Sequence, residues 1–241
     1  MRALVLCLGV LASLGIAGAQ GSAQAAPPPR QLETQLLRAS ERGDAATVRV
    51  LLRRGAHANA AHTEGNTLTA LMLAARGGHE TVLRLLLDAG AKVEESASVA
   101  VGSSGVNEGV TALMLAASSG NVRSVKLLLD RGANPNARAV FKTGDDLREA
   151  GFRTVAMHAS SGAILELLGD RGTDLLGTDA GGNSLLFRAA AEFDASAVRF
   201  LLKKGVDPRV RNRDGETALD WAKRANRDES VKVLEAAASA K

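Results

Sequence analysis

Apolar and polar positions along the chain predict pairs of short helices that recur several times. Residues 69–79 read TALMLAARGGH, and residues 111–121 read TALMLAASSGN. Each string leads into a leucine-rich segment that stops at a glycine, within residues 85–91 and again within residues 127–133. Self-similarity in register is the sequence signature of repeat architectures. We therefore interpret this part of the chain as an array of similar helix pairs.

Start and stop signals divide each pair into two helices of roughly ten residues. Glycine or asparagine, followed by histidine or aspartate, separates the first helix from the second. The second helix carries apolar residues at helical spacing, and these are predicted to form its buried face. In one copy they are Val122, Val125, Leu128 and Leu129. A pair this short cannot bury its apolar face alone, so the copies are expected to stack into a solenoid.

Further copies extend the array in both directions. Residues 184–205 and 217–234 form two copies toward the C-terminus, offset by 33 residues from Ser184 to Thr217. Residues 36–56 form an eroded first copy.

The unit at residues 154–172 fits the pattern least. The interval between its two glycines is shorter than in the preceding unit, and Gly169 stands where Leu129 would align. Loss of a core leucine removes apolar packing. We therefore predict that this unit is a soft hinge in the array.

These strings closely resemble the ankyrin repeat family, whose signature is Gly-x-Thr-Pro-Leu-His-x-Ala-Ala-x-x-Gly-His followed by Leu-Leu-x-x-Gly-Ala-x-x-Asn. The resemblance covers roughly residues 32–238, and the repeat domain is expected at residues 32–241. It implies an all-α, ankyrin-repeat solenoid of about six helix-turn-helix repeats with projecting loops or fingers. The expected repeats are approximately residues 32–64, 65–106, 107–149, 150–178, 179–211 and 212–241. Binding in such proteins usually uses the finger tips and the first helices, which line a concave side.

The sequence departs from the family signature at its histidine. The equivalent positions in the best-matching copies are Met72, Met114, Phe187 and Asp220. We expect apolar packing to replace most of the family's histidine-centred hydrogen bonds. Trp221 also replaces an aliphatic residue in the first helix of the last unit. It is interpreted as a cap on the end of the array, with a binding anchor as the alternative.

Two connections are longer than the others. Residues 93–108 and 137–153 exceed the plain connection at residues 207–215. Because the entropic cost of loop closure grows slowly with loop length, such insertions lower the stability of the fold only slightly. They are therefore either functional fingers or neutral, disordered elaborations. The acidic residues of the second loop are interpreted as an exposed helix start rather than a catalytic cluster. They are Asp145, Asp146 and Glu149.

The N-terminus has the three parts of a secretory signal peptide. Arg2 precedes an apolar run at residues 3–12, and small residues follow at two candidate cleavage sites. Residues 1–25 are thus predicted to be a signal peptide cleaved after Ala19 or Ala25, with a Pro-rich spacer at residues 26–31. An uncleaved anchor or a lipidated cysteine is the alternative, but the run is shorter than the roughly 20 residues of a spanning helix. A periplasmic location is expected, with an extracellular one as the alternative.

Composition narrows the candidate chemistry. Hydrophobic residues make up 46% of the chain and aromatic residues 2%, so the core must be aliphatic and a base-stacking surface is disfavoured. The net charge of +4 comes from dispersed rather than clustered basic residues, which argues against a nucleic-acid partner. The single cysteine, Cys7, lies in the predicted signal, so no thiol chemistry is expected in the mature chain.

No reactive constellation is recognisable in the sequence. It contains no HExxH zinc motif, no phosphate-binding glycine loop and no nucleophile elbow. The four histidines lack ligand-like spacing, and His79 is interpreted as a residue at the start of a second helix. We therefore expect no metal, no cofactor and no catalytic residue.

The leading interpretation is an exported, non-enzymatic module that binds a protein partner through its concave surface. We expect a monomer that does not insert into the membrane once the signal is removed. By the resemblance, the contact residues would be Glu64, Asn66, Arg76, Glu108, Val110, Ser118, Ser119, Asn183, Glu192, Arg213, Glu216 and Arg224. This set mixes both charges with polar groups, which suits a protein better than a polyanion. The alternatives are a structural accessory that supports an envelope enzyme and a hydrolase with a site in the long loops.

Overall fold

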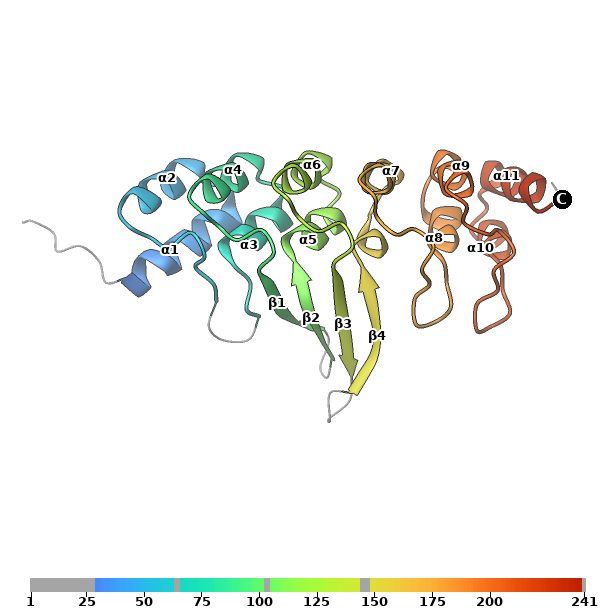
Figure 1. Ribbon diagram of the computed structural model, residues 1–241, viewed down its shortest axis with the longest axis horizontal. Coiled ribbons are helices and arrows are strands. Elements are labelled where there is room, and N and C mark those ends of the chain that lie inside the picture. The colour runs from blue at the N-terminus through green and yellow to red at the C-terminus, as the bar shows by residue number, and fades with distance from the viewer. Residues whose placement is uncertain (1–28, 63–65, 102–104, 144–147, 240–241) are drawn as a thin grey trace, which may run out of the picture.

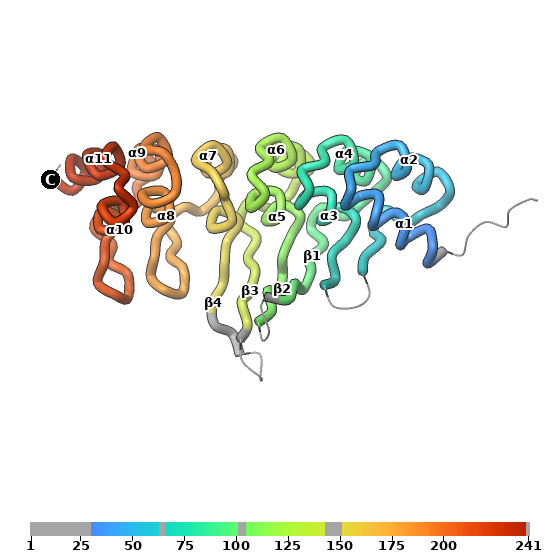
Figure 2. The backbone as a smooth tube through the Cα atoms, turned by 180° about the vertical axis from the view of Figure 1, so that it is seen from behind, coloured from blue at the N-terminus to red at the C-terminus, as the bar shows by residue number. Residues whose placement is uncertain are grey.

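Stacked helix pairs form an elongated array (Figure 1). The computed structural model describes residues 29–62, 66–101, 105–143 and 148–239. Two rows of helices run along the array, and the connecting segments project beyond one row as fingers. The same three tiers are visible from behind (Figure 2). The predicted stack of about six units is confirmed, whereas the predicted signal peptide lies outside the described residues.

The inner row holds the first helical segment of each unit, on the side of the fingers. Its members are α1 (Pro29–Arg42), α3 (Ala70–Gly77), α5 (Ala112–Ser118), the 3-10 turn η1 (Ala156–His158), α8 (Leu185–Glu192) and α10 (Ala218–Arg224). The outer row holds the second helix of each unit. Its members are α2 (Ala45–Arg53), α4 (Glu80–Asp88), α6 (Val122–Asp130), α7 (Gly162–Asp170), α9 (Ala195–Lys203) and α11 (Asp228–Ser239). Each outer helix packs on the next one along the array.

Side-chain caps start several inner helices where the sequence places threonine. The Thr69 hydroxyl accepts a hydrogen bond from the Met72 amide at 3.2 Å, and Thr111 caps α5 in the same way. Such caps satisfy amides that have no partner inside the helix. His79 is the residue that precedes α4, as predicted.

The first helix begins earlier than the predicted spacer allows. α1 starts at Pro29, so residues 29–31 of the expected Pro-rich spacer form its first turn. Proline fits this position because the first helical amides lack intrahelical partners in any case.

The two expected long fingers are β-hairpins, and together they form one antiparallel sheet. β1 (Ser96–Val101) pairs with β2 (Gly105–Thr111), and β3 (Arg138–Thr143) pairs with β4 (Arg148–Thr154). β2 also pairs with β3, from Gly105 opposite Thr143 to Glu108 opposite Val140, which joins the two hairpins in the order β1-β2-β3-β4. Glu149 therefore lies in a strand rather than at a helix start, while Asp145 and Asp146 lie outside the described residues.

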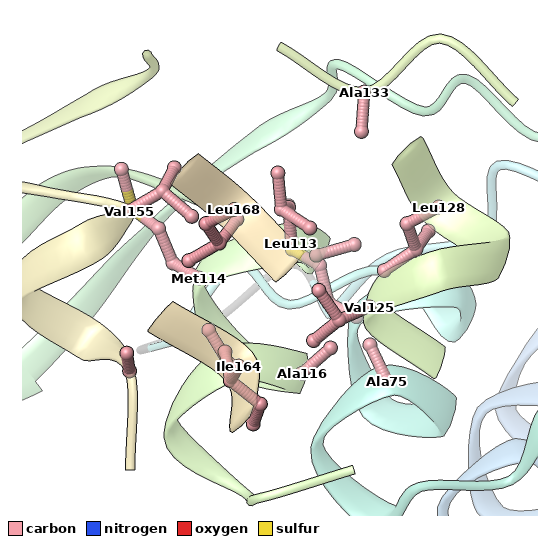
Figure 3. Close-up of a cluster of buried hydrophobic side chains, with 14 of the residues drawn as sticks. Ala75, Leu113, Met114, Ala116, Val125, Leu128, Ala133, Val155, Ile164 and Leu168 are labelled. Atoms are coloured by element: carbon pink, nitrogen blue, oxygen red, sulfur yellow. The ribbon is translucent and has the colours of Figure 1, made fainter. Parts of the chain in front are cut away.

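Aliphatic side chains fill the space between neighbouring units. Figure 3 shows side chains of α5, α6 and α7 meeting in one such layer. Leu113, Leu128, Ile164 and Leu168 are each at most 1% exposed. Val122 differs from the expectation, because at the first position of α6 its side chain is 40% exposed.

The unit at residues 154–172 is better packed than the sequence suggests. A Cβ atom on Gly169 would lie 2.7 Å from the ring of Phe200 and 2.9 Å from Leu175. These two side chains therefore occupy the space that a leucine would fill. Phe200 and Leu175 thus compensate for the leucine that is missing at Gly169, and the soft hinge in this unit stays a prediction.

Polar contacts repeat from unit to unit along the outer row. The aspartate that ends one outer helix pairs with the basic residue that follows the next one. These ion pairs are Asp88–Arg131 (2.9 Å), Asp130–Arg171 (2.8 Å) and Asp170–Lys204 (3.3 Å). Asn136 likewise bridges two units, because its side chain donates to the Gly172 carbonyl and accepts from the Asp174 amide.

Candidate functional site

The inner row is interrupted in its fourth unit. Ten positions separate Thr111, at the end of β2, from Asn121, the cap of α6. Only seven separate Thr154, at the end of β4, from Ser161, the cap of α7. Three residues are nearly one turn of α-helix. The first helix of this unit is accordingly reduced to η1.

A cavity of about 490 Å³ lies beside this shortened segment. Its walls come from the C-terminal end of α5, the end of β4, η1, the finger before α8, and α8 and α10. They include Ser118, Arg153, Met157, His158, Ser160, Asp179, Asn183, Arg188, Glu192 and Trp221. The cavity is thus built from four successive units, although no unit contains it alone.

Arg188 is held firmly at the cavity wall. Its Nε donates to the Glu192 carboxylate at 2.9 Å, and its Nη1 donates to the Met157 carbonyl at 2.5 Å. The guanidinium also lies 5.3 Å from the centre of the Phe193 ring. Because Arg188 lies on α8 and binds the Met157 carbonyl of η1, it links these two segments across the interrupted row.

His158 is a largely buried base between positive charges. Burial, together with the guanidinium groups of Arg153 and Arg188, lowers the pKa of its imidazole to about 4. Its buried Nε2 forms no hydrogen bond within the described part of the chain. His158 is therefore neutral at pH 7.

Trp221 forms an aromatic wall at the C-terminal end of the cavity. Its ring meets Phe187 edge to face, with centroids 5.5 Å apart. Its indole N–H donates to the Glu216 carboxylate at 2.7 Å, and Arg224 also pairs with Glu216. The hydrogen bond from Trp221 and the contact with Arg224 lower the pKa of Glu216. Trp221 thus packs against α8 of the preceding unit, and its interpretation as a cap on the array stays a prediction.

The finger before α8 is closed by its own polar side chains. The Asp179 carboxylate accepts from the amides of Gly181 and Asn183 and from the Asn183 side chain. Asn183 in turn accepts from Asn212 of the next finger at 3.0 Å. This network fixes the neighbouring cavity wall.

Three of the predicted contact residues line the cavity: Ser118, Asn183 and Glu192. Val110 does not reach the surface, because its β2 side chain is 3% exposed in the core. Glu64 lies outside the described residues.

The other predicted contact residues lie along the inner row and the fingers. Arg76 is exposed and pairs with Glu41 at 2.8 Å, and the Ser119 hydroxyl donates to the Arg76 carbonyl at 2.7 Å. Asn66 accepts from the Ala100 amide, so it braces the edge of β1. The remaining members are Glu108, which pairs with Lys142, Arg213, which is exposed on a finger, and the paired Glu216 and Arg224.

Sequence reasoning missed the positive groups of the cavity, Arg153 and Arg188, and the neutral His158 between them. The signal that could have located them is the spacing of seven rather than ten between the threonine and the outer-helix cap.

The described residues contain neither a candidate metal-binding cluster nor a helix that could span a membrane. They contain no cluster of three or more histidine, cysteine or acidic side chains that could hold a metal ion. No helix within this part of the chain has both the length and the apolar character needed to cross a membrane.

One solved structure combines sequence and structural similarity to this chain. It is a chain of the Bd0816 predatory endopeptidase from Bdellovibrio bacteriovorus in complex with the immunity protein Bd3460. The identity is 28%, the TM-score is 0.65, and the match covers 84% of this chain and 97% of that chain. Since 575 solved chains match, the fold alone does not select a partner. No curated protein matches by sequence.

The family match covers the repeats on both sides of one finger and leaves out residues 140–153. The pattern of ankyrin repeats in three copies matches residues 36–139 and 154–240. Of the unmatched residues between these ranges, those that the structure describes belong to β3 and β4. The match covers most of the chain, and the stacked helix pairs have the corresponding arrangement. The chain therefore belongs to the ankyrin repeat family.

Proposed function

We propose that this protein is an exported ankyrin repeat module that binds a peptidase and inhibits it. The observation that carries the proposal is the likeness to a chain of the complex between an endopeptidase and its immunity protein, which extends over 97% of that chain. An immunity-type role requires binding rather than turnover, which agrees with a sequence that contains no recognisable catalytic motif.

The surface formed by the inner row and the fingers suits such binding. It contains the cavity at η1, and it presents exposed side chains of both signs, such as Arg76, Glu192 and Arg213. A mixed surface of this kind favours a protein over a polyanion. The four-stranded sheet adds rigidity beside it, and rigid surfaces lose less entropy on binding.

Export is part of the proposal and is supported by the pattern of residues 1–25. A monomer in the periplasm would meet peptidases that act on the cell envelope. Immunity against such an enzyme is needed in the compartment where the enzyme is active.

Co-purification from the envelope fraction, followed by a peptidase assay, tests the proposal. The matched variants are R76E/R213E on the inner row and finger surface and R49E/R199E on the exposed outer row. We expect capture of a peptidase, a fall in its activity with added protein, and loss of both effects only in R76E/R213E.

Two results would contradict the proposal. Equal capture by R76E/R213E and the native protein would place binding elsewhere. Capture of an enzyme whose activity is unchanged or increased would instead indicate an accessory that supports an envelope enzyme.

A further inference from the structure

The cavity at the interrupted inner row brings two arginines, Arg153 and Arg188, together with Trp221. We propose that it receives the carboxylate of an acidic side chain from the partner protein. Arg153 and Arg188 would bind the carboxylate, and Trp221 would pack against the methylene groups. The inference rests on the proposed function, because it assumes that the occupant is a protein.

Arg188 is arranged to recognise such a group. Its bonds to Glu192 and Met157 engage two of the three guanidinium nitrogens and fix the plane of the group. The third nitrogen carries two further N–H donors. A guanidinium that is already oriented loses little side-chain entropy when it binds a carboxylate.

The two carboxylates that line the cavity, Asp179 and Glu192, do not pair with Arg153. Asp179 accepts hydrogen bonds from its own finger, and Glu192 pairs with Arg188. Neither lies within ion-pair distance of Arg153, since both residues and Arg153 are described and no such pair is formed. An incoming carboxylate would therefore meet a cation that these two acids leave unmatched.

The pKa of His158 reflects the positive charges near its ring. The two charges that act on its ring are both positive, and together with burial they hold its pKa near 4. A bound carboxylate would oppose these charges and favour the protonated ring. Occupation of the cavity should thus be linked to proton uptake by His158. Arg153 on β4, Arg188 and Glu192 on α8, and Asp179 before α8 are the charged groups that line the cavity around it.

The position of the cavity favours a side chain over a chain terminus. It lies within the array, with α5 on one side and α10 on the other. A folded partner that spans this surface can insert a side chain from any crossing segment. A terminal carboxylate would require the partner chain to end at this point.

Trp221 provides a direct test that needs no identified partner. The chain contains one tryptophan and no tyrosine, so indole fluorescence reports on the surroundings of Trp221, which lines the cavity. The probes are the blocked peptides acetyl-Gly-Gly-Glu-Gly-Gly-amide, its glutamine counterpart, and acetyl-pentaglycine with a free carboxyl terminus. We expect the glutamate peptide to change the emission with a Kd on the order of 1 mM, and the other two to bind about tenfold more weakly or less. NMR titration should show a higher pKa of His158 with the glutamate peptide than without it.

Three variants connect this response to the cations. R153Q should weaken binding of the glutamate peptide about tenfold, and R188Q should weaken it at least as much. R123Q, on the exposed side of α6, is the matched control and should bind as the native protein does. Because Arg188 also links η1 to α8, R153Q decides the result if R188Q is poorly folded.

The outcomes separate this inference from the proposed function. Equal responses to the glutamate and glutamine peptides, or a native response in R153Q, would overturn the carboxylate site. Equal perturbation by inorganic phosphate would also overturn it, because the cavity would then be a general anion site. A normal peptide response without any captured peptidase would leave the site intact and refute the proposed function.

Discussion

His158 is a largely buried titratable residue whose Nε2 has no hydrogen-bond partner among the described residues. Its pKa of about 4 lies below the ordinary value of 6.5 because burial and two arginines disfavour the charged ring. In the unfolded chain the ring would bind a proton first as the pH falls. This residue therefore links the stability of the interrupted unit to pH.

We predict that the unfolding free energy falls between pH 6.5 and pH 4 by up to about 3 kcal/mol because of His158. Its contribution is fully present above the unfolded pKa and is lost as the pH drops toward the folded value. The measurement is urea unfolding at pH 7 and pH 4.5. H158Q should show a smaller loss than the native protein, whereas H57Q, at an exposed position, should show the full loss. Identical pH dependence in all three proteins would contradict the prediction.

Asn136 shows how a single side chain couples two units. It bonds to the backbone of the following unit at Gly172 (3.1 Å) and Asp174 (2.7 Å). N136A should lower the unfolding free energy by about 1–2 kcal/mol, since both bonds are lost. D130A removes an exposed ion pair and should cost less than about 1 kcal/mol. Chemical denaturation of both variants checks the order, and a larger loss in D130A would refute it.

At the scale of elements, the pairing of β2 with β3 joins the fingers of adjacent units. Gly109 lies at the end of this pairing with φ of +80°, and a Cβ atom there would be 2.9 Å from the Arg138 carbonyl. The close approach is between two backbones, so a side chain cannot move aside to relieve it. Gly132 has a similar φ of +87° with nothing within 4 Å of the added carbon.

G109A should therefore destabilise the protein more than G132A. Positive φ costs of order 1–3 kcal/mol in either variant, and G109A adds the clash with β3. Thermal and urea unfolding measure the difference, and NMR shifts should move in β2 and β3 only for G109A. Equal stability of the two variants would contradict this prediction, because it would mean that moving β2 away from β3 at Gly109 does not lower the free energy of unfolding.

The helices follow from local patterns, whereas the strands do not. Threonine caps, apolar spacing and terminal glycines predict the inner and outer helices of most units. Residues 93–108 are rich in small residues and lack a clear alternation of apolar and polar positions. β1 and β2 pair with each other inside this finger, and β2 also bonds to β3 of the next finger, more than 30 residues away in sequence.

At the scale of the whole molecule, the array has a continuous outer row and an interrupted inner row. The fourth unit keeps a packed outer helix, since Ile164, Leu165 and Leu168 are at most 1% exposed. Its inner segment is a single turn, with backbone bonds from His158 to Val155 and from Ala159 to Ala156. Its other bonds go to neighbouring units, from the Ser160 amide to the Ala117 carbonyl and from Arg188 to the Met157 carbonyl. Weakness in this unit is therefore expected in the turn and not in the core of α7.

Hydrogen exchange should locate this weakness. We predict that amides at residues 156–160 exchange at least about tenfold faster than those of α5, while those of α7 are protected. Units of such arrays exchange partly independently, because each contacts only its neighbours. Protection at residues 156–160 equal to that at residues 111–132 would refute the hinge. R188Q should increase the exchange at η1, because Arg188 binds the Met157 carbonyl.

The sequence by itself determined the helix pairs, their order and the need to stack, because caps and apolar spacing act within a few residues. It also identified the surface on which Ser118, Asn183 and Glu192 lie. The cavity that brings these residues together with Arg153, His158 and Arg188 was decided only by the tertiary structure. The physical reason is that the shortened inner segment creates a cavity only when the helices of the neighbouring units line it. The sheet and the filling of the space at Gly169 by Phe200 depend on such non-local contacts in the same way.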